Sequence, residues 1–290
     1  MAKGQTSYNL QKQEFLNSVV NKIGKQVYST TAYTNPLKRL KKGFIDNAKD
    51  VEEIYIARAV GSAYDADGGG ALDRKKPEVI TRYHQDVQDM DYQVTVQDKQ
   101  VRFGFHSKDG VNKLANEIMD SMHTGAEYDE YNKVIALLTE MTTSPKKSVV
   151  VADVTDNASA KAFIKEVKKH INKMGRRSSE YASVENHSRK EQLILFLNED
   201  WDVEIDIELL ASAFNMSKTQ LDDCVKILIP DLGNKTKAIL VDERALQIYD
   251  LFYEVEPQRN AKGKFTNYFL STEKMFCYSD LVNMCVFKTE

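Results

Sequence analysis

Residues 35–43 read Asn-Pro-Leu-Lys-Arg-Leu-Lys-Lys-Gly, and residues 51–55 read Val-Glu-Glu-Ile-Tyr. The proline disfavours a helical backbone at the residue before it, so a helix that precedes this stretch should end there. The leucines and lysines of the first part alternate without a clear period. Residues 54–60 are rich in residue types that favour strands, which predicts a change from a basic segment to β structure.

Upstream of this stretch, apolar residues recur at spacings of three and four over residues 11–28, which predicts an N-terminal helix. Residues 1–49 hold nine Lys/Arg and two Asp/Glu, a charge of +7. The net charge of the whole chain is −3, so the remaining residues carry −10. A basic segment of this kind can lie along a polyanion, contact an acidic neighbour or stay a solvated tail, and charge alone leaves all three open.

Downstream, residues 64–70 form a glycine-rich stretch that is typical of a loop tip. Asp65 and Asp67 stand where an EF-hand loop has its first and third calcium ligands. The fifth ligand position would be Gly69 and the twelfth Lys76, which puts a cation where calcium needs a carboxylate. We therefore expect no calcium site here.

Apolar residues alternate with polar ones at 92–96 and 101–105, which predicts a hairpin. Helical spacing follows at 111–123 and 128–141, and we expect a break between these helices near Thr124 and Gly125. Strands and helices then alternate to the C-terminus. We expect strands at 148–154, 193–197, 225–229 and 238–241, helices from Asp156 or Asn157 onward and at 205–215, and a mainly β section at 251–287 with a polar turn at 259–263.

The helix that begins near residue 157 has a strongly basic face. Its cations are Lys161, Lys165, Lys168, Lys169 and Lys173, followed by Arg176 and Arg177. A phosphate-binding role fits these residues, but no interleaved aromatic residue offers a platform for stacking bases. A solvated lysine-rich face is the simpler interpretation.

Motifs for catalysis or metal binding do not stand out. The five histidines lack metal-ligand spacing, and no phosphate-binding loop, dinucleotide fingerprint or nucleophile elbow occurs. The three cysteines, Cys224, Cys277 and Cys285, form no CxxC pair and are expected as reduced thiols in a cytoplasmic setting. No apolar run is long enough to span a bilayer. We therefore expect no catalytic residue, no metal, no cofactor and no membrane segment.

A series of short motifs occurs in a fixed order along the chain. They are Asn35–Gly43, Val51–Tyr55, Tyr64–Ala66, Pro77–His84, Phe105, Ala126–Tyr131, Leu209–Met216, Ala238–Asp242, Arg259–Asn260, Gly263 and Asn267–Tyr268. Together they resemble the major capsid proteins of phi-29-like short-tailed bacteriophages. The similarity extends over about residues 20–287, and the collinear order of the matches makes it specific.

The resemblance implies an α+β fold of the Hong Kong 97 capsid type, with an N-terminal arm, an extended E-loop hairpin, a spine helix, a peripheral domain and an axial domain. Residues 1–43 would be the arm, and 44–145 the E-loop and spine helix with part of the peripheral domain. Residues 146–245 would be the axial domain, and 246–290 strands that return to the peripheral and axial domains. The family's immunoglobulin-like C-terminal domain is expected to be absent.

The implied function is assembly into the icosahedral or prolate head that encloses double-stranded DNA, located in the virion and, during assembly, in the host cytoplasm. Expected partners are further copies in hexons and pentons, a scaffolding protein, the portal, and DNA held by non-specific phosphate contacts. At the E-loop tip, whose sequence departs from the family's acidic tip, the candidate inter-subunit residues are Asp65, Asp67, Gly68, Gly69 and Gly70. In the arm, the candidates for contact with DNA or a neighbouring subunit are Lys38, Arg39, Lys41 and Lys42.

Two alternatives stay open at this point. One is the shell protein of an encapsulin-like cellular nanocompartment with the same fold. The other is an α/β enzyme that uses the basic helix at 161–177 to bind a phosphorylated substrate.

Overall fold

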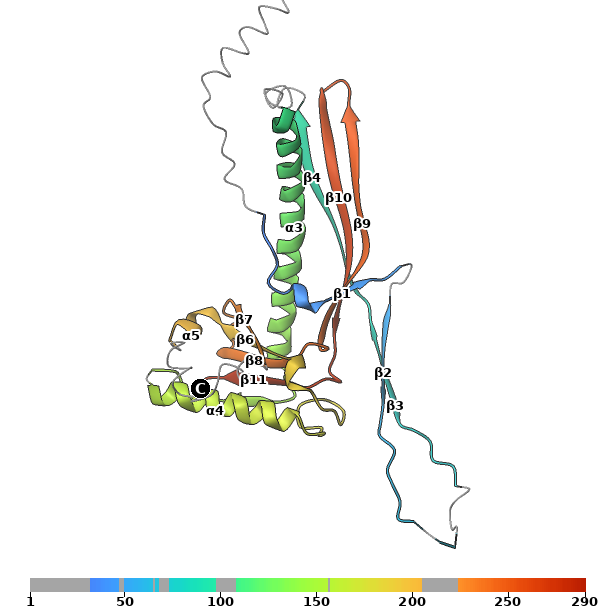
Figure 1. The fold of residues 1–290 in the computed structure, drawn as a ribbon, viewed down its shortest axis with the longest axis vertical. Coiled ribbons are helices and arrows are strands. Elements are labelled where there is room, and N and C mark those ends of the chain that lie inside the picture. Colours follow the sequence, from blue (N-terminus) through green and yellow to red (C-terminus); the bar gives the residue numbers. More distant parts are fainter. Residues whose placement is uncertain are drawn as a thin grey trace, which may run out of the picture. The chain divides into compact units, whose positions relative to one another are not determined.

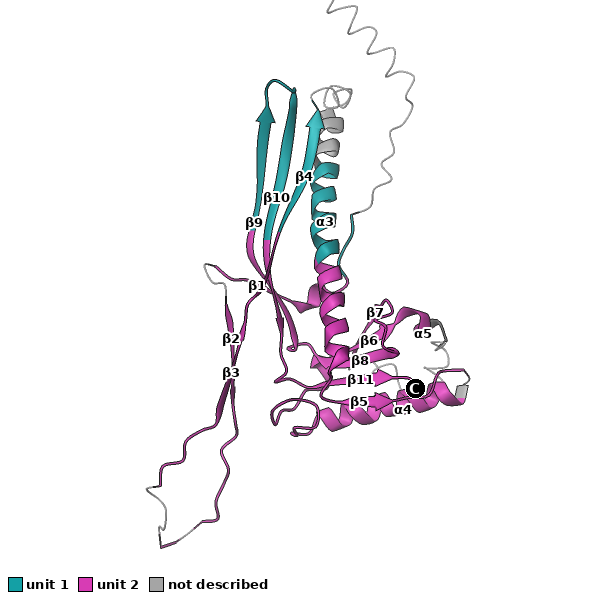
Figure 2. Cartoon of the chain, turned by 180° about the vertical axis from the view of Figure 1, so that it is seen from behind, with its two compact units in different colours: residues 1–35, 90–129, 253–272 teal, residues 36–89, 130–252, 273–290 magenta. Residues whose placement is uncertain are grey.

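A computed structural model describes residues 32–46, 50–64, 66–67, 73–97, 108–155, 157–204 and 224–290. The chain divides into two compact units (Figure 2). Unit 1 contains residues 1–35, 90–129 and 253–272, and unit 2 contains residues 36–89, 130–252 and 273–290. The predicted helices at 11–28 and 205–215 lie outside the described residues.

Unit 1 is built from parts of three strands and one helix. The elements are β4 (Asp86–Gln97), β9 (Leu246–Asn260), β10 (Phe265–Tyr278) and α3 (Lys108–Thr143), all of which continue into unit 2. Met122, Ala126 and Leu270 form the buried centre, with side chains of β4 and β9 packed against it. The strand neighbour of β4 is β10, and the second strand of the hairpin predicted at 92–105 lies outside the described residues.

The helix α3 is continuous, so the predicted break near Thr124 and Gly125 is wrong. Gly125 instead permits a close approach to β4, because a Cβ at this position would lie 3.0 Å from Cδ1 of Tyr92. The Tyr92 hydroxyl donates a hydrogen bond of 2.9 Å to Asp129, one turn further along α3. A glycine costs about 1 kcal/mol relative to alanine inside a helix, which packing of this kind readily offsets.

Unit 2 contains a five-stranded sheet in the order β5-β11-β8-β6-β7. Its strands are β5 (Ser148–Val150), β6 (Leu193–Asn198), β7 (Val225–Ile229), β8 (Thr236–Asp242) and β11 (Met284–Lys288). The predicted strands at 193–197, 225–229 and 238–241 are thus confirmed, whereas the one predicted at 148–154 ends at Val150. The shorter elements are η2 (Lys190–Gln192) and α5 (Glu199–Glu204).

Both faces of this sheet are covered at its centre, which explains why β6, β8 and β11 are largely apolar without alternation. Helix α4 (Asn157–Met174) begins where the sequence predicts and lies along one side of the sheet (Figure 1). Its Phe163 and Val167 pack with Leu240 and Phe287. On the other face, residues of the last turns of α3, including Leu138, pack with the strand residues that point the opposite way.

The basic stretch at residues 37–43 is part of unit 2. It forms the turn η1 (Lys38–Leu40) and the strand β1 (Lys41–Phe44), which pairs in parallel with β9. Leu37 and Leu40 are fully buried in the main hydrophobic cluster. The irregular alternation of leucine and lysine therefore reflects a short turn with one side buried.

The C-terminal section is β structure as predicted, since β9 and β10 are joined by a turn at 261–264 and β11 follows. Within the described residues, no helix is both long and apolar enough to cross a membrane.

Candidate functional site

The strands β2 (Val51–Ile56) and β3 (Val79–His84) form an antiparallel hairpin of unit 2 with two unlike faces. Successive side chains of a strand point to opposite faces, so the register assigns each pair to one side. One face carries the pairs Val51–His84, Glu53–Arg82 and Tyr55–Ile80. The other face carries the pairs Glu52–Tyr83, Ile54–Thr81 and Ile56–Val79.

The first face is tied by polar contacts to the turn that follows β10. Glu53 accepts a hydrogen bond of 2.7 Å from the hydroxyl of Ser279. Arg82 donates from Nε and from its terminal nitrogen to the two carboxylate oxygens of Asp280, at 3.1 and 3.2 Å. The hydrogen bond from Arg82 lowers the pKa of Asp280, and a second one from Ser183 acts in the same direction. This paired geometry fixes the direction of the hairpin as well as its distance.

A second tie joins β2 to the loop after α4. The Tyr55 hydroxyl donates to the backbone oxygen of Glu185 at 2.8 Å. The carboxylate of Glu185 lies 3.1 Å from Nε of Arg58 and 3.7 Å from Nε of Arg177. The two ion pairs are exposed and each contributes little stability. Together with the Tyr55 hydrogen bond and the first tie, they determine which face of the hairpin is turned toward its own subunit.

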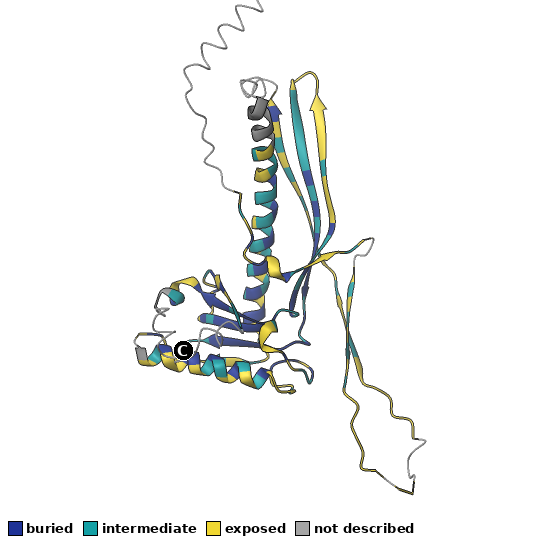
Figure 3. Ribbon diagram, in the orientation of Figure 1, coloured by how far each residue is buried: buried dark blue, intermediate teal, exposed yellow. Residues whose placement is uncertain are grey.

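The second face of the hairpin is left open and is largely apolar. Its exposed fractions are 56% for Ile54, 61% for Ile56, 51% for Val79 and 65% for Tyr83. Figure 3 shows β2, β3 and the segments beyond them coloured mainly as exposed. We call Ile54, Ile56, Val79 and Tyr83 the open apolar face. Adjacent apolar side chains exposed on a two-stranded ribbon are typical of a surface that another chain covers.

Of the five residues predicted at the loop tip, Asp67 lies in a turn and is exposed. Asp65 and residues 68–70 lie outside the described residues. Sequence reasoning missed the polar ties at Glu53, Arg82, Asp280 and Glu185. The burial of residues 51–56 alternates in the structure, but their sequence, Val-Glu-Glu-Ile-Tyr-Ile, does not alternate and gives no indication of the partners.

The four predicted basic residues have different environments. Arg39 forms an ion pair of 2.9 Å with Glu243 and also donates to a backbone oxygen. Nζ of Lys41 lies 2.9 Å from Asp250 and 3.6 Å from Glu130. Burial alone would lower the pKa of Lys41, but these two carboxylates outweigh it and raise the pKa. Lys38 and Lys42 are exposed. Arg39 and Lys41 thus have carboxylate partners within the chain.

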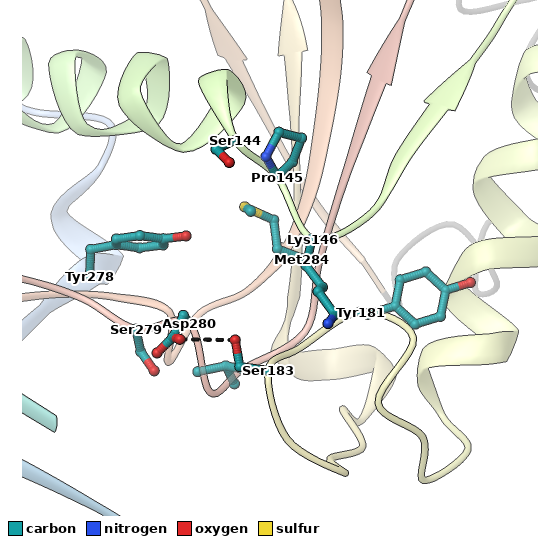
Figure 4. A pocket seen from close by; sticks show the side chains of 10 residues that line it. Ser144, Pro145, Lys146, Tyr181, Ser183, Tyr278, Ser279, Asp280 and Met284 are labelled. Atoms are coloured by element: carbon teal, nitrogen blue, oxygen red, sulfur yellow. Dashed lines mark hydrogen bonds between the residues drawn. The ribbon is translucent and has the colours of Figure 1, made fainter. Parts of the chain in front are cut away.

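A cavity of about 380 Å³ lies next to the hydrogen bonds of Ser279 and Asp280 with the hairpin, and its lining does not form a recognisable catalytic arrangement. Figure 4 shows Ser183 donating to Asp280 on its wall. A carboxylate whose pKa is lowered is a weak base, so Asp280 is poorly suited to activate this serine. Among the described residues, no group of three or more His, Cys, Asp or Glu side chains could hold a metal ion.

The thiols are also unsuited to nucleophilic chemistry. Burial raises the pKa of Cys224 to about 11, and it raises the pKa of Cys277 and of Cys285 to about 12. All three are free cysteines. Because the thiolate is the nucleophile, these groups are unreactive at neutral pH.

Comparison with known proteins identifies related molecules. A family model described as Phi29-like phage major capsid protein matches residues 2–288. The major capsid proteins of Bacillus phage B103 and Bacillus phage PZA are 28% and 27% identical over 95% and 94% of this chain. The match spans 63% of the length of each of these two relatives.

Among solved structures, a chain of the capsid of Staphylococcus phage Andhra superimposes with a TM-score of 0.77 and 14% identity. The match covers 92% of this chain and 87% of that one. At this identity the likeness shows a shared fold, which is that of a phage capsid protein.

Proposed function

The chain belongs to the Phi29-like phage major capsid protein family, and from this membership we propose that it is the major capsid subunit of a phage head. It has the α+β Hong Kong 97-type capsid fold of its structural neighbours. In the proposed function, copies of the chain assemble into an icosahedral or prolate shell around double-stranded DNA. The protein is then part of the virion, and it passes through the host cytoplasm during assembly. A family of shell subunits is consistent with a protein that is not an enzyme.

The observation that carries the proposal is the open apolar face of the β2–β3 hairpin. Burying one large apolar side chain contributes about 1.5–3 kcal/mol. The four side chains are each 51% to 65% exposed, so covering the remainder of each contributes roughly 1 kcal/mol and together about 4 kcal/mol. Every copy both offers such a face and covers one, so modest contacts add up over a closed shell.

The polar ties support a cover that comes from outside the subunit. Glu53, Tyr55 and Arg82 hold the opposite face of the hairpin against their own subunit. Because side chains alternate, this face and the open apolar face cannot both turn toward the same surface. In the proposed head, the molecule that covers Ile54 and Ile56 is a second copy of the chain.

The parts of the fold take their proposed roles from this arrangement. The hairpin with its tip is the E-loop, and α3 is the spine helix within residues 44–145. Residues 1–43 act as the arm, 146–245 as the axial domain and 246–290 as returning strands. Hexons and pentons, a scaffolding protein and the portal are the proposed protein partners, and exposed Lys38 and Lys42 remain candidates for contact with DNA or a neighbour.

The two alternatives draw less support. A nanocompartment shell would use the same hairpin, but the family membership favours a phage head. The phosphorylated-substrate enzyme would need a reactive group beside the basic helix. The cavity described above and the three thiols provide none in the described part of the chain.

The test is a pair of double variants on the open apolar face. Ile54→Lys with Ile56→Lys should leave the subunit folded, because both side chains are more than half exposed, but it should abolish closed shells. Ile54→Val with Ile56→Val keeps the surface apolar and should still give shells. Circular dichroism reports folding, and electron microscopy of the purified protein reports assembly. Normal shells from the lysine variant would refute the proposed role of this face.

A further inference from the structure

The solvent side of α4 has two unlike halves. Its buried side chains, such as Phe163 and Val167, face the sheet. With 3.6 residues per turn, positions 161, 165 and 168 fall on one half of the opposite side, and positions 166, 169 and 173 fall on the other. Both halves carry lysines, so their difference lies in the surrounding carboxylates.

The half at 166–173 is neutralised within the chain. Nζ of Lys169 lies 2.9 Å from Glu166, and this hydrogen bond lowers the pKa of Glu166. Nζ of Lys173 lies 3.9 Å from Glu180, which also pairs with Lys147 at 2.8 Å. Each lysine of this half therefore has a carboxylate at ion-pair distance.

On the half at 161–168, the difference concerns two lysines. Lys161 and Lys165 are exposed, and neither forms an ion pair with a carboxylate of the described part of the chain. Lys168 stands one turn further along, and both its partial burial and nearby Lys190 of η2 lower its pKa. Lys190 thus adds a cation from a second element next to Lys168. We call Lys161, Lys165, Lys168 and Lys190 the α4 lysine row.

A row of this kind fits a polyanion whose charges repeat along a line. A rise of 1.5 Å per residue places Lys161 and Lys165 about 6 Å apart along the helix axis. Lysine is a flexible, strongly hydrated point charge that suits phosphate without reading sequence. No aromatic residue lies at these positions, so duplex phosphates fit better than unstacked single-stranded bases. By contrast, Arg39 and Lys41 of the basic segment already pair with carboxylates.

We propose that the α4 lysine row is a surface of the subunit that holds duplex DNA through its phosphates. The inference rests on the proposed function, because a phage head encloses DNA. It assigns the contact with DNA to the α4 lysine row in preference to residues 38–42. If this surface contacts DNA in the head, α4 faces the lumen.

The salt dependence of DNA binding tests the proposal. Binding of a 20-base-pair duplex of random sequence is measured by fluorescence anisotropy at several salt concentrations, with protein that is kept unassembled. The slope of log K against log salt is about −0.9 for each phosphate neutralised. Lys161→Gln with Lys165→Gln should therefore make the slope shallower by about 1.8. The matched control, Lys169→Gln with Lys173→Gln on the neutralised half, should change it little.

Equal slopes for the row variant and the wild type, or an equal loss in the control, would overturn the proposal. A polyglutamate peptide serves as the competing polyanion. If the wild type binds this peptide more tightly than DNA and the row variant loses that binding, the surface serves an acidic protein segment. Shell formation is read separately by electron microscopy, so a failure to assemble, which counts against the proposed function, leaves the DNA result interpretable.

Discussion

A buried ion pair between α3 and β10 gives a sharp prediction for stability. The side chain of Glu130 is 2% exposed and that of Lys274 is 8% exposed, and Lys274 donates a hydrogen bond to the Glu130 carboxylate. Lys41 approaches the same carboxylate at 3.6 Å and Asp250 at 2.9 Å. The cluster thus joins α3, β1, β9 and β10 within unit 2.

Replacing Glu130 with alanine should be strongly destabilising. Lys274 would remain buried without the carboxylate, and breaking a buried pair in this way costs about 3–5 kcal/mol. The free energy of unfolding of a protein is typically about 5–15 kcal/mol, so the loss is large. The control is Glu243→Ala, which removes an ion pair with Arg39 whose side chains are 22% and 38% exposed. An exposed pair contributes about 0–1 kcal/mol.

Urea denaturation of the unassembled protein, followed by circular dichroism, measures both changes. The double variant Glu130→Leu with Lys274→Met should recover most of the loss, because apolar residues can replace a buried ion pair at little cost. The reasoning is refuted if Glu130→Ala shifts the free energy of unfolding no more than Glu243→Ala does.

Two further predictions concern unfolding of the same unassembled protein. Burial, with Lys173 nearby, lowers the pKa of His170. Below about pH 6.5 the histidine of the unfolded chain therefore binds a proton, while that of the folded chain is still neutral. Stability should fall as pH drops below that value, by at most about 1.4 kcal/mol per pH unit from this group, and denaturation of His170→Phe between pH 7 and 5 should show a correspondingly flatter dependence. Gly125→Val places methyl groups against the Tyr92 ring and should lower the free energy of unfolding by about 1–3 kcal/mol more than the control Ser121→Val at an exposed position of α3. An equal effect of the two substitutions would contradict the close approach of β4 at Gly125.

Local patterns predicted the elements whose surroundings are uniform. The strands at 193–197 and 238–241 are predicted correctly because the centre of the sheet is covered on both faces, so every residue there is apolar. Helix α4 is predicted correctly because its apolar residues recur with the helical period on one side and its lysines lie on the other. The prediction of a helix break at Gly125 was wrong, because a glycine can mark either the end of a helix or a position where another element approaches closely, and the sequence does not distinguish the two.

The candidate site could not be read in this way. Residues 51–56 read Val-Glu-Glu-Ile-Tyr-Ile, which favours a strand from Ile54 onward but does not alternate, so the two faces of β2 appear only in its burial. Which side is tied to the subunit depends on Ser279, which lies 226 residues from Glu53, and on Asp280, which lies 198 residues from Arg82. Polar residues of this kind occur throughout the chain, so composition gives no indication of the pairing.

The sequence by itself determined the family, through motifs in a collinear order, and the helices and strands that have a regular apolar period. The tertiary structure decided which strands are neighbours, which lysines are neutralised and which face of the hairpin stays open. The physical reason is that periodicity reports the average surroundings of a segment, whereas a hydrogen bond or an ion pair needs two particular groups within about 3–4 Å. Folding alone brings groups so distant in the chain to that separation.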